Sequence, residues 1–167
     1  MTLIKNKDQR VAVLVDVQNM YHSAKALYKK RVNFKEILKE AVAGRKLIRA
    51  IAYVVRTETP EEKTFFEALN KAGFEIKSKD LQVFPGGMKK GDWDVGIAID
   101  AVKLSGQMDS IILVAGDGDF IPLIEYLKSN KGIQTEIMAF DKSTSGKLKE
   151  AADGFIDLEK NPRKFLI

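Results

Sequence analysis

The chain has 167 residues, 45% of them hydrophobic and 31% charged, and its net charge is +5. This length and mixture are typical of one soluble domain with a substantial core, and they exclude disordered, fibrous and membrane-spanning classes. The chain has no cysteine and one histidine, which excludes disulfides, thiolate nucleophiles and metal sites built on cysteine or histidine clusters. The first residues lack the apolar core of a signal peptide. We therefore expect a cytoplasmic protein with no membrane partner.

The first predicted element is a strand over 11–15, an apolar and β-branched run that ends at Asp16. The rest of the chain alternates between helical and strand-like patterns. In chain order, we expect helices over 18–30 and 34–42, a strand over 47–55, a helix over 61–73, a strand over 74–84, a loop over 85–91, a helix over 92–105, a strand over 110–115, a helix over 119–130 and a strand over 133–140.

This alternation predicts a mainly parallel sheet of about five strands covered by helices, because parallel neighbours require crossover connections. We expect residues 1–167 to form a single domain of this α/β class. In such Rossmann-like sheets, ligands bind outside the carboxyl ends of the strands. Asp16 and Asp117 each follow a predicted strand, so both should lie at that edge.

Carboxylates reach this edge from three separate stretches. They are Asp16, close to Asn19; then Asp92, Asp94 and Asp100; then Asp117 and Asp119. Taken singly, each is most simply a helix cap or a turn residue. The sequence supplies pairs at two of the three places, however, and carboxylates at one edge repel each other unless a cation lies between them. Ligands that offer only oxygen suit Mg²⁺ or Mn²⁺, bound singly or as a pair.

Two further polar residues have two open interpretations each. Asp100 lies in an almost wholly apolar helical segment, about 9 Å and about 240° of helical rotation from Asp94, so the two do not share one metal directly. Asp100 either supports the metal ligands or makes a purely structural bond to a backbone group or a lysine. Asn19 either positions a water or a phosphate, or simply starts a helix.

The predicted loop over 85–91 carries basic residues directly before the second acidic stretch. A nuclease needs cations beside its carboxylates, because phosphates and an acidic metal site repel each other. The cations available here are Lys77, Lys79, Lys89 and Lys90. Trp93 could stack a base, although a single tryptophan at a helix start is more often part of the core.

Three blocks of the sequence resemble the signature blocks of NYN domains, in particular the LabA-like group of the PIN-like nuclease superfamily. The blocks are VLVDVQNMY, KGDWDVGIAIDAV and IILVAGDGDFIPLIEYLKSNKGIQTEIM, and the resemblance covers about residues 10–158. It implies a three-layer, PIN-like α/β/α sandwich and metal-dependent cleavage of RNA. The residues that match the family's positions are Asp16, Asn19, Asp94, Asp100, Asp117 and Asp119. Asp92 is an additional carboxylate that would support the metal ligands or could replace Asp94 as one of them.

These observations lead to the hypothesis of a metal-dependent ribonuclease. Asp16, Asp94, Asp117 and Asp119 would bind Mg²⁺ or Mn²⁺ with help from Asn19, and the basic segment would bind RNA. The alternative is a non-catalytic RNA-binding or regulatory module of the same fold, which would keep the basic residues but could lose the carboxylates. The C-terminal segment 160–167 could extend the RNA surface or dock on a second subunit in a homodimer.

Overall fold

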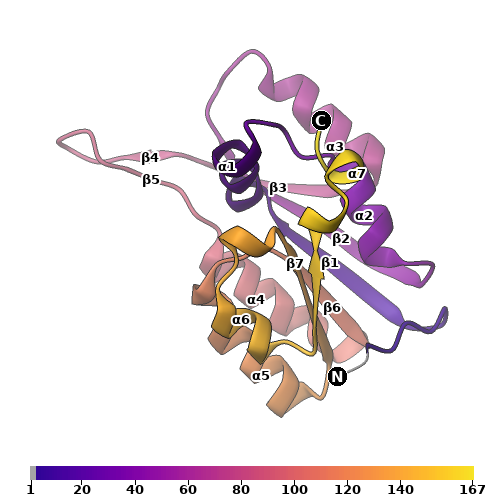
Figure 1. The fold of residues 1–167 in the computed structure, drawn as a ribbon. Coiled ribbons are helices and arrows are strands. Elements are labelled where there is room, and N and C mark those ends of the chain that lie inside the picture. The colour runs from indigo at the N-terminus through magenta and orange to yellow at the C-terminus, as the bar shows by residue number, and fades with distance from the viewer. Residues whose placement is uncertain (1–2) are drawn as a thin grey trace.

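The central feature is a sheet of six parallel strands (Figure 1). The computed structural model describes residues 3–167, apart from the side chains of Lys89 and Lys90. Along the sheet the order is β3-β2-β1-β6-β7-β8. The strands are β1 Arg10–Asp16, β2 Lys46–Arg56, β3 Glu75–Asp80, β6 Ser110–Val114, β7 Gln134–Ala139 and β8 Gly154–Asp157. The chain progresses outward in both directions from β1 and β6, so the strand order reverses between these two strands.

Helices cover both faces of the sheet and give three layers (Figure 1), which confirms the predicted α/β/α class. One face packs against α1 Val17–Tyr28, α2 Phe34–Val42, α3 Glu62–Ala72 and α7 Pro162–Phe165. The other face packs against α4 Asp94–Leu104, α5 Ile121–Lys131 and α6 Gly146–Ala151. Successive side chains of β1 alternate between the two cores, and both sets are fully buried, as the continuous apolar run predicts.

The sheet has one strand more than the sequence indicates. The additional strand is β8, which pairs only with β7 and is half-buried. Its four residues, GFID, begin with glycine and are too few to show a periodic pattern. The hydrogen-bonded pairing with β7 therefore makes these residues a strand, although their own sequence does not predict one.

Residues 74–91 differ most from expectation. The predicted strand over 74–84 ends earlier, since β3 stops at Asp80. The predicted loop over 85–91 belongs instead to an antiparallel hairpin of β4 Gln82–Val83 and β5 Lys89–Lys90, which projects from the body as an arm (Figure 1). Gly86 and Gly87, inside the predicted loop, have positive φ values of 95° and 87°, and this turn brings β5 back alongside β4.

The apolar end of the C-terminal segment packs on its own chain. Phe165 and Leu166 are 4% and 5% exposed and belong to the core under α1 and α2. The backbones of Arg31 and Ile167 exchange two hydrogen bonds of 2.9 and 2.8 Å. The prediction that this apolar end docks on a second subunit is therefore wrong for Phe165 and Leu166.

A buried ion pair fixes the amino edge of the sheet. Arg45 Nη1 donates to Glu136 Oε2 at 2.8 Å, and both side chains are fully buried. Ser110 also donates to Glu136, so the pair ties β6 and β7 to the turn before β2. The sequence did not reveal this contact, because its partners lie 91 residues apart.

Among residues 3–167, no helix combines the length and the apolar composition that crossing a lipid bilayer requires.

Candidate metal centre

The acidic stretches meet at the carboxyl edge of the sheet, where the strand order reverses. β1 and β6 are parallel neighbours with Val15 opposite Val114. The residues that follow these two strands therefore leave the sheet side by side. This is the place where α/β sheets of this kind bind their ligands.

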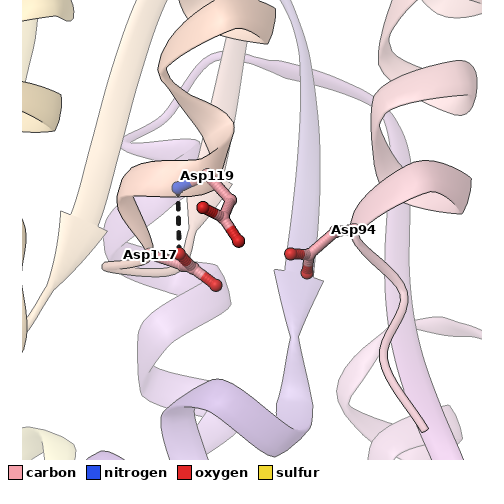
Figure 2. A group of neighbouring side chains, drawn as sticks. All are labelled: Asp94, Asp117 and Asp119. Carbon is pink, nitrogen blue, oxygen red and sulfur yellow. Dashed lines mark hydrogen bonds between the residues drawn. The ribbon is translucent and has the colours of Figure 1, made fainter. Parts of the chain in front are cut away.

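Three carboxylates converge at this edge (Figure 2). Asp117 and Asp119 come from the loop after β6, and Asp94 is the first residue of α4. Each offers one carboxylate oxygen, and these oxygens all lie within 4.8 Å of one another. Asp94 and Asp117 are half-buried, whereas Asp119 is exposed. The structure thus brings together three of the four metal ligands that the sequence predicted.

A side-chain hydrogen bond within the loop GDGD and a closely packed glycine help to set its shape. Asp117 Oδ1 accepts from the Asp119 backbone N–H at 2.9 Å and caps the short 3₁₀ helix η2 Gly118–Phe120 (Figure 2). A Cβ atom on Gly116 would lie 2.8 Å from the Ser143 carbonyl oxygen. A glycine is required at this position because the loop approaches another backbone segment so closely.

Asp94 is held in place by the residues around it. Trp93 Nε1 donates to the Val54 carbonyl at 2.8 Å, and the Asp94 backbone N–H donates to Asp92 Oδ1 at 3.2 Å. The Trp93 ring lies against Gly96, where a Cβ atom would come within 2.5 Å of it. Asp92 is exposed and shapes the turn before α4, outside the group of three carboxylates.

Asp16 and Asn19 connect the first strand to the same loop. Asp16 Oδ1 accepts from the Asn19 backbone N–H at 3.1 Å and so caps α1. Asn19 Oδ1 in turn accepts from the Gly116 backbone N–H at 3.1 Å. Asp16 is only 7% exposed and lies outside the group of three. The Asn19 amide is thus engaged in aligning the β6 loop with the start of α1.

The pKa values of Asp94 and Asp16 are raised by burial and by the neighbouring carboxylates. Burial, followed by the charges of Asp117 and Asp16, raises the pKa of Asp94 to about 6. Burial, followed by Asp117 and Asp92, raises the pKa of Asp16 to about 6, although the Asn19 N–H and Lys79 act against this. A cation among these oxygens would favour the ionised forms and relieve the repulsion.

Asp100 binds a lysine, as one of the two predictions for this residue stated. It accepts from the Lys77 ammonium at 2.7 Å and from the Tyr53 hydroxyl at 2.8 Å. These bonds tie α4 to β2 and β3 and engage Lys77 in an ion pair.

The other predicted nucleic-acid residues differ in their surroundings. Trp93 is partly buried, with its ring centroid 5.3 Å from that of Tyr53 and Lys79 Nζ 4.9 Å from the same ring. This packing favours a structural role for Trp93, and it places the Lys79 ammonium beside the site. The side chains of Lys89 and Lys90 lie outside the described part of the structure.

A second acidic group escaped the sequence analysis. Asp141, Asp157 and Glu159 offer carboxylate oxygens within 4.8 Å of one another, at the carboxyl ends of β7 and β8. Asp157 Oδ1 accepts the Glu159 backbone N–H at 2.9 Å, and Lys149 pairs with Asp141 at 2.5 Å. Asp141 comes directly after a predicted strand, but its partners lie at the end of β8, a strand that the sequence pattern did not predict.

Comparisons with known proteins agree with this architecture. The NYN domain family model matches residues 10–159. The "Low amplitude and bright protein LabA" of Synechococcus elongatus is 26% identical, over 91% of this chain and 85% of the relative. A crystal structure of a Vibrio parahaemolyticus protein of unknown function superimposes with a TM-score of 0.89 at 30% identity, covering 99% of this chain and all of the other. The chain therefore belongs to the NYN domain family, which is related to the PIN-like nucleases.

Proposed function

We propose that the chain is a metal-dependent ribonuclease in which Asp94, Asp117 and Asp119 bind Mg²⁺ or Mn²⁺. The observation that carries the proposal is the convergence of three carboxylate oxygens within 4.8 Å at the edge of the sheet where ligands bind. Membership of a family related to PIN-like nucleases supports the same class of reaction.

The residues present suit such an ion. All the donors are oxygen atoms, the type that Mg²⁺ and Mn²⁺ prefer, and one of the three side chains is exposed, so that water and substrate can reach them. When bound, such an ion would lower the pKa of a water ligand and neutralise charge that develops on a phosphodiester.

The chain's own residues would assist in two ways. Asp16 commits one oxygen to the Asn19 N–H, which leaves its other oxygen to accept a hydrogen bond from a water or to join the ligand set. Asn19 holds the loop that carries Asp117 in line with α1 through its bond to Gly116. Asp16 and Asn19 therefore orient the centre from its buried side.

RNA is the substrate that we propose, by analogy with the family. A groove of about 480 Å³ lies between the base of the arm and the start of α4, and Lys79, Asp92 and Val95 are among its lining residues. Lys79 supplies a positive charge next to the acidic group, as a phosphate strand requires. A cytoplasmic location and a homodimer complete the proposal.

The test is a Mn²⁺ titration with labelled single-stranded RNA. Wild type should cut the RNA in a metal-dependent manner, and Asp94→Asn and Asp16→Asn should each lower the rate by about 100-fold or more, on the scale of losing a charge that stabilises the transition state. Glu125→Gln, which changes an exposed carboxylate on α5, is the matched control and should cut normally. Tight RNA binding without cutting under any metal would instead favour the non-catalytic module.

A further inference from the structure

Four exposed cationic side chains gather at the end of α1 and in the residues after it. This basic patch consists of Lys25, Lys29, Lys30 and Arg31, which together with Tyr21 and Ile167 line a cavity of about 190 Å³. None of the four forms an ion pair with any residue among 3–167. Cations gathered without ion-pair partners repel each other, and a polyanion would relieve that repulsion.

The basic patch lies at the same edge of the sheet as the acidic group. Asp16 caps the start of α1, and at the other end of the helix the Tyr28 ring packs against Phe140, directly after β7, with centroids 5.5 Å apart. Burial and the neighbouring Glu159, which follows β8, raise the pKa of Tyr28 to about 12. α1 therefore crosses the carboxyl ends of the strands from β1 towards β8 and does not return to the amino edge.

The spacing along α1 suits a single strand of nucleic acid. Thirteen residues separate Asp16 from Lys29, which corresponds to about 20 Å of helix, a length that a few nucleotides of a single strand can span. Between them, Tyr21 is 43% exposed and has Lys25 Nζ 5.6 Å from its ring centroid. An exposed aromatic ring flanked by cations is the combination that single-strand binding surfaces use, because the ring stacks a base while the cations hold phosphates.

We propose that the basic patch binds phosphates of a single-stranded RNA a few nucleotides from the bond that is cut, and that Tyr21 stacks a base between the basic patch and that bond. The inference rests on the proposed function, in which the RNA is cut at Asp94, Asp117 and Asp119. Side chains must hold the phosphates, because the carboxyl end of α1 carries the negative end of the helix dipole.

The first experiment measures binding without any divalent metal. The affinity of a labelled 12-nucleotide single strand is followed against salt concentration for wild type, for Lys29→Gln/Arg31→Gln and for Lys103→Gln/Lys131→Gln. The last pair is the matched control, since both lysines are exposed and lie at the opposite edge, in the last turns of α4 and α5.

Each lost phosphate contact lowers the slope of log affinity against log salt by about 0.7. The basic-patch variant should therefore lose about 1.4 from the slope, which is roughly 25-fold weaker binding at 0.1 M salt. The control variant should bind like wild type. Unchanged binding of the basic-patch variant, or equal weakening of both variants, would overturn the inference.

A second measurement separates this inference from the proposed function. With Mn²⁺ present, the basic-patch variant should raise KM for the 12-nucleotide RNA and leave kcat unchanged. If wild type cuts RNA but the basic-patch variant binds and cuts equally well, the inference is wrong and the nuclease proposal stands. If the basic-patch variant binds RNA more weakly than wild type but no metal supports cutting, the proposal that the basic patch binds RNA stands and the nuclease proposal is wrong.

Discussion

Replacing Asp16 by asparagine should stabilise the metal-free protein at neutral pH. Asp16 is 7% exposed, and burial is the largest reason why its pKa is raised from 3.8 to about 6. A carboxyl whose folded pKa is raised contributes stability below pH 3.8 and loses it as the pH rises through about 6. Asparagine has the same shape, carries no charge and keeps an oxygen for the Asn19 N–H, so the variant avoids this loss.

The size of the effect follows from the pKa. The interval from 3.8 to about 6 corresponds to about 3 kcal/mol at neutral pH, with about 1.4 kcal/mol for each pKa unit. Because Asp16 is almost fully buried, solvent screening removes little of this energy. The difference in unfolding free energy between Asp16→Asn and wild type should be small near pH 4 and approach about 3 kcal/mol above pH 7.

Urea unfolding in EDTA at about pH 4, 5.5 and 7.5 measures this difference, and Glu125→Gln serves as the control with no such dependence. Mg²⁺ at about 100 times its Kd should then stabilise wild type by about 2.7 kcal/mol and the variant by less. A variant that is less stable than wild type by the same amount at every pH would refute the reasoning. It would mean that the cap of α1 matters and the buried charge does not.

Three other substitutions test the packing around the site and the core. Glu136→Ala leaves a buried arginine unpaired and should cost about 3 to 5 kcal/mol in urea unfolding, whereas Glu75→Ala, which breaks an exposed pair, should cost less than about 1 kcal/mol. Gly116→Ala forces the acidic loop away from a neighbouring backbone and should cost about 1 to 3 kcal/mol and weaken Mn²⁺ binding in calorimetry, whereas Gly106→Ala, with open space around it, should do neither. Trp93→Phe keeps a ring but loses the indole hydrogen bond to the Val54 carbonyl. Mn²⁺ affinity should therefore fall by several-fold, while the free energy of unfolding should change by about 1 kcal/mol. Unchanged Mn²⁺ affinity would count against a role of Trp93 in holding the start of α4.

The sequence by itself determined the class of fold and the family. The run 11–15 is apolar at every position because β1 is buried on both faces, so its burial could be predicted without any knowledge of its neighbours. Asp16 and Asp117 follow apolar strands, and the carboxyl ends of parallel strands share one edge. Their proximity therefore followed from the strand pattern alone.

Only the tertiary structure decided which carboxylates converge. The sequence favoured Asp94 over Asp92 as the ligand but left the choice open. In the structure, the Trp93 bond to the Val54 carbonyl sets the start of α4, and Asp94 faces the loop while Asp92 shapes the turn. β8 was missed for a related reason, since four half-buried residues become a strand only by pairing with β7.

The course of α1 was equally hidden. A helix pattern gives length and the apolar face, but the direction of the axis depends on packing against distant segments. Here Tyr28 meets Phe140, 112 positions later in the chain, and this contact keeps the basic patch at the edge that carries the acidic group. Local periodicity reports what each segment buries, whereas the partner that covers it is set by contacts between residues far apart in the chain, and these arise only when the whole sheet forms.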